Sequence, residues 1–149
     1  GQTWIENRCI GNPELLPWNR ATLLSISAGG FSDWRLPTLI ELKGLIDRQY
    51  GRPAIEPSVF FGFEGDAFYW TATQHNTDYA KLVNFFTGED FPGRMKSEYR
   101  VRLVRGGRNL AITTAGLGSG SVIAIPQQKY YANESKIALT AKPKVSRVR

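Results

Sequence analysis

Four basic side chains in the second half of the chain have the chemistry to bind an anionic ligand. They are Arg94, Lys96, Arg100 and Arg102. A guanidinium fork matches the geometry of sulfate and carboxylate groups, so an anionic polysaccharide is a suitable ligand class. In residues 99–105, apolar side chains alternate with two of the arginines, so a strand there would bury one face and direct both guanidinium groups to the other. The alternative is a solvated sheet face, or ion pairs with Glu98 and with carboxylates elsewhere in the chain.

A polar segment near the middle of the chain is the second candidate for ligand binding. It consists of Gln74, His75, Asn76, Thr77 and Asp78. Connections on a rigid scaffold commonly carry recognition, because their side chains are free to vary without disturbing a core. The segment also holds the single histidine of the sequence, on which any Ser-His-Asp chemistry would depend.

The remaining residues argue against catalysis and against a bound cofactor or metal ion. We find neither a G-x-S-x-G elbow nor a phosphate-binding P-loop. Cys9 is the single cysteine, which excludes an internal disulfide, a C-x-x-C pair and a thiolate cluster. The paired carboxylates, Glu89-Asp90 and Glu64 with Asp66, fall in predicted turns, where solvated acids are common. The Glu-Pro-Asn, Gln-Pro-Asp and Trp-Asn-Asp signatures of calcium-dependent lectins do not occur, so we expect a non-enzymatic protein without calcium.

The triplet Asp33-Trp34-Arg35 offers an acid beside an electrophile, yet its position favours a structural role. It lies between a predicted helix end and a predicted capping box, so we expect the two charged groups to pin a buried loop and Trp34 to fill the core. Trp4, Trp18 and Trp70 are likewise predicted in the core rather than on a sugar-stacking platform.

Composition and charge limit the classes of protein that these residues can belong to. The chain has 149 residues and a formal charge of +6, with no apolar stretch long enough to cross a bilayer, so we predict one soluble globular domain without a membrane span. Residues 1–93 hold 7 Lys and Arg against 11 Asp and Glu, a net of −4, whereas residues 94–149 hold 12 against 2, a net of +10. This asymmetry predicts a localised basic surface. Nucleic acid is a minor option, because the sequence lacks zinc-finger spacing, an RNP-like strand and a basic helix leading into heptads.

Local patterns predict the elements that must position these residues. A helix over residues 17–28 would end at Gly29-Gly30, and Thr38 with Glu41 forms a capping box for a helix over residues 38–48. Alternation and β-branched or aromatic content predict strands in the next part of the chain, at 68–73, 80–86 and 99–105. A turn is predicted at 87–90. Three further short strands are predicted in the basic tail, at 110–114, 121–125 and 136–141.

Four ordered sequence blocks resemble a known family. They are GFSDWRLPT at 30–38 with Glu41-Leu42 and Ile46-Asp47, YWTAT at 69–73, LVNF at 82–85 with Gly88, and VRLVRGG at 101–107. They are similar to the Lcl_C-type domain, the C-terminal domain family of collagen-like adhesins. The resemblance implies a C-type-lectin-like fold of the α+β class, with two short helices and an antiparallel sheet, in secreted or surface proteins of bacteria. We accordingly predict a lectin-like domain over 1–107 and a basic, β-rich tail over 108–149, which weakly resembles bacterial surface β-repeats.

The same resemblance bears on Cys9. In the family a first strand and a cysteine commonly precede the G-Q-T-W segment, which here begins at Gly1, so we expect a piece of a longer protein whose first strand lies upstream. Cys9 is then either a small buried side chain or half of a disulfide to a residue outside the chain, in an exported, oxidising compartment. The formylglycine-generating enzymes, which are distantly akin, use paired cysteines that this chain lacks.

Two functions remain after these exclusions. The first is an adhesin-like module that recognises a surface polysaccharide or protein ligand. The second is a structural subunit of an extracellular fibre, in which residues 110–149 pack on a neighbouring subunit and form a homo-oligomer.

Overall fold

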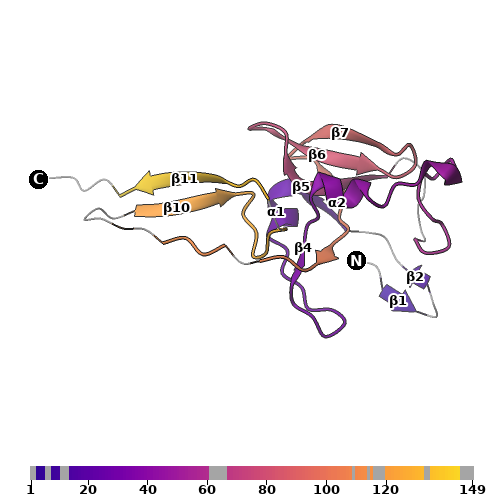
Figure 1. Ribbon diagram of the computed structural model, residues 1–149, viewed down its shortest axis with the longest axis horizontal. Coiled ribbons are helices and arrows are strands. Elements are labelled where there is room, and N and C mark those ends of the chain that lie inside the picture. Colours follow the sequence, from indigo (N-terminus) through magenta and orange to yellow (C-terminus); the bar gives the residue numbers. More distant parts are fainter. Residues whose placement is uncertain are drawn as a thin grey trace, which may run out of the picture.

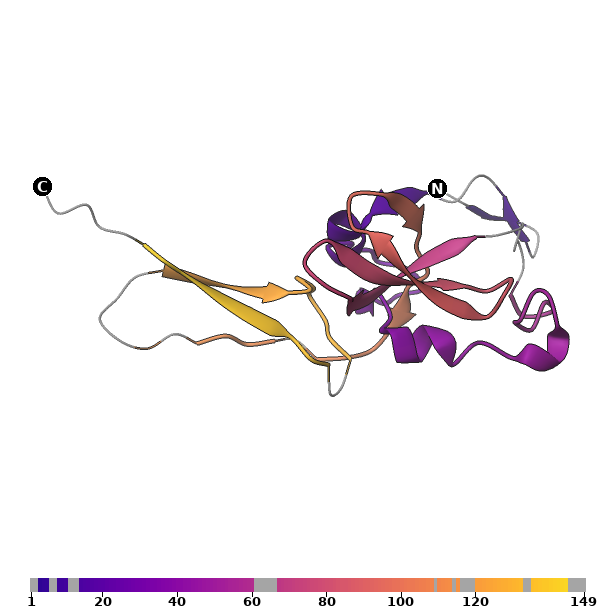
Figure 2. The same cartoon turned by 90° about the horizontal axis from the view of Figure 1, so that it is seen from above.

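The protein consists of a body built on a five-stranded sheet and a hairpin that projects from it (Figures 1 and 2). The computed structural model describes residues 3–5, 8–10, 14–60, 67–108, 110–113, 115, 120–132 and 135–144. Short helices accompany several antiparallel sheets, so the α+β class predicted from the sequence agrees with the observed elements.

The five-stranded sheet combines a meander of three consecutive antiparallel strands with two strands from distant parts of the chain. In spatial order its strands are β3 (Leu15–Pro17), β8 (Glu98–Arg100), β5 (Phe68–Gln74), β6 (Tyr79–Asn84) and β7 (Glu89–Arg94). The β5 and β8 strands run parallel, with Tyr69 opposite Arg100, whereas the other neighbouring pairs are antiparallel. At the β7 edge, Pro92 supplies no N–H donor, which limits pairing with a further strand.

Both faces of the sheet are packed, because successive side chains of a strand point to opposite faces. On one face the core contains Trp70 and Leu82, with Trp18 from α1 (Trp18–Thr22) packed among them. On the other face it contains Tyr69 and Val83. Two tryptophans tie the first core to backbone: the indole of Trp18 donates to the Thr71 carbonyl at 2.8 Å, and that of Trp70 donates to the Leu16 carbonyl at 2.7 Å.

Trp34 was predicted in the core and is instead half-buried. Its indole N–H donates to the Ala28 carbonyl at 3.0 Å near the surface. The reason is its place in β4 (Trp34–Arg35), a two-residue strand on the margin of the body. The side chain of Trp4 lies outside the described residues.

The two helices begin where the sequence predicts and end much earlier. The capping box is confirmed at α2 (Leu39–Lys43), where the Thr38 hydroxyl accepts from the Glu41 N–H at 3.3 Å and the Glu41 carboxylate accepts from the Thr38 N–H at 2.9 Å. Gly44 ends this helix, and a 3-10 turn, η1 (Arg48–Tyr50), follows. After α1, residues 23–30 are mostly exposed, so no buried face continues the helix. Gly29 and Gly30, at φ of 60° and 78°, reverse a loop there rather than cap a long helix.

Two strand predictions also need correction. Residues 99–105 do not form one strand: the chain leaves the large sheet after β8 and pairs again as β9 (Val104–Arg105) with β4. The apolar alternation still holds, because Tyr99, Val101 and Leu103 all pack against the first core. The predicted turn at 87–90 occupies residues 85–88, and Glu89 starts β7, which sequence patterns missed because Pro92 and Gly93 interrupt it.

Two further hairpins lie outside the large sheet. Near the N-terminus, β1 (Thr3–Ile5) pairs with β2 (Arg8–Ile10), which sets the Cys9 backbone opposite that of Trp4. In the tail, β10 (Gly120–Ile125) pairs with β11 (Ala138–Pro143), close to two of the predicted strands, whereas residues 110–113 are irregular. The hairpin runs away from the body, with the end of β11 at its far tip (Figure 2).

Backbone hydrogen bonds join the first residue of this tail to the loop between β10 and β11. The Arg108 N–H donates to the Tyr131 carbonyl at 2.8 Å, and the Tyr131 N–H donates back to the Arg108 carbonyl at 2.9 Å. The Tyr131 ring is buried, and its hydroxyl donates to the Pro126 carbonyl at 2.8 Å. Ile125 packs against the first core. Of these contacts, the packing of Ile125 on the first core crosses the predicted boundary at 107, so the tail is held against the body there.

Candidate functional site

A buried ion pair, Arg35 with Glu41, fixes the loop between β4 and α2. Arg35 is only 6% exposed, and its guanidinium donates two hydrogen bonds to the Glu41 carboxylate at 2.8 and 2.6 Å. The third nitrogen of the guanidinium, Nε, donates to the Gly106 carbonyl at 2.7 Å. Asp33 accepts from the Gly106 N–H at 3.0 Å. The prediction that Asp33 and Arg35 pin a buried loop is confirmed.

The same contacts decide the protonation of Glu41. The hydrogen bonds from Arg35, and after them those from Thr38, lower the pKa of Glu41 to about 2 against the opposing effect of burial. Glu41 is therefore ionised at all physiological pH values, and the charges of the pair cancel locally. The geometry of the Arg35–Glu41 pair is therefore that of a structural contact, and we call this pair the clasp.

A second carboxylate, Asp90, is also committed to ion pairs. Lys43 from α2 lies 2.6 Å from one of its oxygens and Lys81 from β6 lies 3.0 Å from the other. The hydrogen bond from Lys43, and after it the one from Lys81, hold the pKa of Asp90 below its usual value. Asp90 was predicted as a solvated turn residue beside Glu89, and it is instead a half-buried link between helix and sheet.

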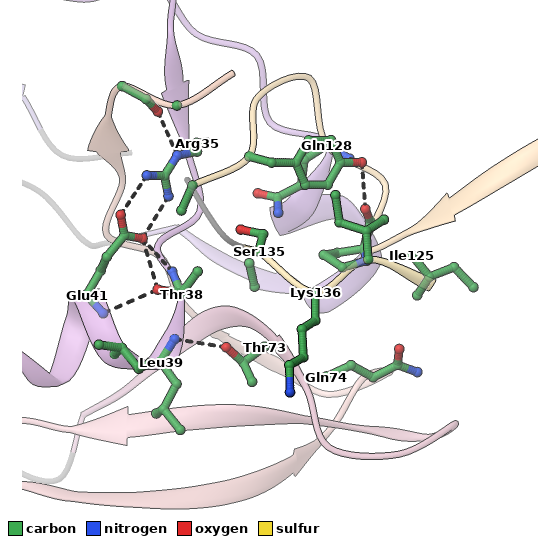
Figure 3. A pocket seen from close by; sticks show the side chains of 18 of the residues that line it. Arg35, Thr38, Leu39, Glu41, Thr73, Gln74, Ile125, Gln128, Ser135 and Lys136 are labelled. Atoms are coloured by element: carbon green, nitrogen blue, oxygen red, sulfur yellow. Dashed lines mark hydrogen bonds and ion pairs between the residues drawn. The ribbon is translucent and has the colours of Figure 1, made fainter. Parts of the chain in front are cut away.

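A groove of about 1050 Å³ lies where the tail meets the body (Figure 3). We call it the junction groove. One wall comes from α2 and the end of β5, and the other comes from the loop between β10 and β11. The residues that line it and that matter below are Leu39, Ile40, Gln74, Arg105, Ile125, Gln128, Tyr131, Lys136 and Ile137. Gln74 is the single member of this lining that sequence analysis assigned to a ligand site.

The predicted ligand residues near Gln74 form a second surface. The β5–β6 connection is held by Asn76, whose side-chain oxygen accepts from the Asp78 and Tyr79 N–H groups at 3.0 and 2.9 Å. The Met95 N–H donates to the Asp78 carbonyl at 2.9 Å, so the β7–β8 turn lies directly beside this connection. We call residues 74–78 together with Arg94 and Lys96 the turn cluster. Arg94 and Lys96 are exposed, as are residues 75–78.

Arg94 is oriented within this cluster by one aromatic side chain. Its Nε donates to the Tyr79 hydroxyl at 3.0 Å, and its guanidinium lies 5.8 Å from the centre of the Tyr79 ring. This contact fixes the orientation of the Arg94 guanidinium, and with it the directions of the remaining N–H donors.

Arg100 and Arg102 belong to a different part of the molecule. Arg100 lies opposite Tyr69 at the start of β5, five residues before Gln74, which separates it from the turn cluster by roughly 17 Å along the strand. Arg102 lies over the rings of Phe60 and Tyr69, at 5.1 and 5.8 Å. The four cations singled out in the sequence therefore form two groups rather than one patch.

Within the described ranges, no three His, Cys, Asp or Glu side chains gather in a way that could hold a metal ion. In the same part of the chain, none of the helices has the length and apolar character that a bilayer span requires. The Cys9 side chain, proposed as half of a disulfide, lies outside the described residues.

Comparison with known proteins identifies the body. The family model of the Lcl C-terminal domain matches residues 2–105. The chain belongs to the Lcl C-terminal domain family. No curated protein and no solved structure matches it. The Lcl C-terminal domain here carries the whole turn cluster, whereas the tail wall of the junction groove, which lies within 125–132 and 135–138, is beyond the matched region.

Sequence reasoning missed most of the junction groove. Arg35 and Glu41 were recognised as structural, but Gln128 and Lys136 were not singled out, because they meet the body only through contacts between segments far apart in the chain. The available signal was the composition change after Gly107, which marks an added segment without showing where it packs.

Proposed function

We propose that this chain is a non-enzymatic binding module of a secreted or cell-surface bacterial protein, with a C-type-lectin-like fold and an adhesin-like role. In this proposal the turn cluster recognises an anionic surface ligand, such as an acidic or sulfated polysaccharide. Membership of the Lcl C-terminal domain family supports the extracellular, adhesin-like part of the proposal.

The observation that carries the choice of site is the hydrogen bond between the Met95 N–H and the Asp78 carbonyl. It sets two exposed cations, Arg94 and Lys96, beside a turn rich in amide side chains. The cations supply attraction for sulfate or carboxylate groups, and the Gln74 and Asn76 amides suit the hydroxyl groups of a sugar. Asp78 is the one carboxylate in the cluster, so the net charge of the cluster is positive.

The site predicts a specific loss of heparin binding. The double variant Arg94→Ala with Lys96→Ala removes both cations from exposed positions, so the fold is expected to persist. We expect about tenfold weaker binding and a shallower dependence on salt, because two charge-assisted contacts are lost. Heparin affinity across a NaCl series measures both quantities.

The matched control is the double variant Lys142→Ala with Lys144→Ala. It removes the same charge from exposed positions at or just beyond the end of β11, away from the turn cluster. Equal losses in the two variants would show that binding follows total charge, and a wild-type protein that heparin does not retain would contradict the proposal outright.

A second candidate function, a structural subunit of a fibre, is favoured by the projecting hairpin. Every residue of β11 is exposed, and Leu139 is exposed by 57%. A two-stranded hairpin is marginal on its own, so a neighbouring subunit packed on it would stabilise it.

Light scattering after size exclusion, over a range of concentrations, tests this alternative. We expect a concentration-dependent rise in mass that Leu139→Asp abolishes, because a charge would then enter the apolar contact. Ser121→Asp, also on the exposed part of the hairpin, controls for added charge alone. A wild-type chain that stays monomeric at millimolar concentration would eliminate the subunit function.

A further inference from the structure

The walls of the junction groove are mainly aliphatic. On the body side Ile40 is exposed by 84%, the largest fraction among the exposed large hydrophobic residues in the described part of the chain. Ile125, Pro126 and Ile137 line the tail side. Covering such side chains removes apolar surface from water, so a ligand with apolar groups would bind more tightly there.

The charge within the groove is positive. Arg35 and Glu41 neutralise one another, and Glu41 has no oxygen left without a hydrogen bond. Arg105 has a distant carboxylate partner, Asp33 at 3.9 Å, and Lys136 has no ion-pair partner among the described residues. In Figure 3 the Lys136 side chain runs from the tail wall toward the Thr73–Gln74 end of β5. A carboxylate bound in the groove would meet this ammonium group.

One buried acceptor in the groove has no donor. The side-chain oxygen of Gln128 is shielded from solvent and makes no hydrogen bond within the described structure. An acceptor without a donor destabilises the protein, so a turn of the Gln128 side chain toward a donor in the groove would be favourable. The N–H groups of a peptide backbone are donors of the right kind, and they recur along an extended chain.

The lining disfavours a sugar or a nucleic acid. Tyr131 is the one aromatic residue in the described lining, and it is 6% exposed with its hydroxyl bonded to Pro126. The groove therefore offers no ring face for stacking, on which sugar and base recognition commonly depend. Its volume is at the upper end of the range for ligand pockets, which is enough for a short peptide.

We infer that the junction groove binds an extended peptide segment that carries small aliphatic side chains and at least one carboxylate. The aliphatic groups contact Ile40 and Ile137, the carboxylate pairs with Lys136, and a backbone N–H donates to Gln128. This site shares Gln74 with the turn cluster, but none of the contacts inferred here uses Gln74, and one wall of the groove comes from beyond the Lcl C-terminal domain. The inference therefore does not depend on the polysaccharide proposal.

A fluorescence anisotropy titration with the complete chain tests the inference. The probe is a fluorescein-labelled Ala-Val-Glu-Val-Asp-Ala peptide, and Ala-Val-Lys-Val-Lys-Ala is its charge-reversed counterpart. We expect saturable binding of the acidic peptide below 1 mM and at least tenfold weaker binding of the basic one. Lys136→Glu is expected to weaken the acidic probe at least tenfold, and Ile40→Ser to weaken it several-fold.

Lys142→Glu is the charge-matched control, because Lys142 is exposed on the same hairpin but does not line the groove. It should leave peptide binding unchanged, and circular dichroism should show all variants folded. Equal binding of the two peptides, equal effects of the two lysine variants, or no saturation by 1 mM would overturn the inference. The inference would also be overturned if a heparin tetrasaccharide displaced the peptide from the wild type but not from Lys136→Glu.

Discussion

Glu41→Ala is expected to destabilise the protein by about 3 kcal/mol. The substitution leaves the Arg35 guanidinium buried without its carboxylate, and breaking one side of a buried pair costs more than the pair itself contributes. It also removes the acceptor for the Thr38 N–H, so the capping box of α2 loses the half that Glu41 supplies, while the Thr38 hydroxyl keeps its own bond. We place the value at the low end for such pairs because the Glu41 side chain is 34% exposed.

Urea denaturation of the wild type and the variant measures this difference. Glu89→Ala is the control, since Glu89 is an exposed carboxylate at the start of β7 and its loss should change stability by less than about 0.5 kcal/mol. Similar midpoints for Glu41→Ala and Glu89→Ala would show that the clasp is not important for stability.

The same pair predicts a pH dependence with a definite sign. Because the pKa of Glu41 falls from 4.5 to about 2 on folding, its stabilisation is fully present above pH 5. It is lost as the pH falls from 4.5 toward 2. We therefore expect the stability difference between the wild type and Glu41→Ala to be constant from pH 5 to 8 and to shrink by about 2 kcal/mol in acid, after allowance for solvent screening.

Gly107→Ala is expected to release the base of the tail from the body. Gly107 has a φ of 118°, and a Cβ there would collide with the Tyr131 carbonyl oxygen and lie 2.9 Å from Arg35 Nε. The added methyl group therefore strains the backbone and displaces the oxygen that Arg108 uses. Together these effects cost about 3 kcal/mol.

Hydrogen exchange localises this loss. The Arg108 and Tyr131 amides, which bond to each other's carbonyls, should exchange about 100-fold faster, while amides shared by β5 and β6 keep their protection. Gly106→Ala is a close control, because Gly106 also has a positive φ, 88°, but open space where the Cβ would be. If the two variants behave alike, backbone strain alone explains the effect and the close approach of the tail has no separate energetic role.

Local sequence signals located the parts of the fold that depend on neighbouring residues. The capping box at Thr38 and Glu41, and the aromatic and β-branched run at β5, are both recovered because their chemistry is complete within a few residues. Helix length was overestimated because α1 and α2 end where packing partners end, and the sequence window does not show those partners. The split of residues 99–105 between two sheets has the same cause.

The candidate sites show the same limit more sharply. The turn cluster joins residues 74–78 to Arg94 and Lys96 through pairing of β6 with β7, and β7 was not predicted at all. The sequence analysis grouped Arg100 and Arg102 with Arg94 and Lys96, although strand register sets Arg100 opposite Tyr69, at the other end of β5. The junction groove depends on a bridge between Arg108 and Tyr131, which no local pattern marks.

The most direct test of the proposed function is an NMR titration with a heparin-derived oligosaccharide on the isotopically labelled chain. We expect the amide signals of residues 74–78 and 94–97 to shift first and to saturate together, with Arg94 the most affected. Shifts that centre on residues 100–102 or on the groove wall at 125–132 and 135–138, or that spread evenly along β11, would contradict the proposed function.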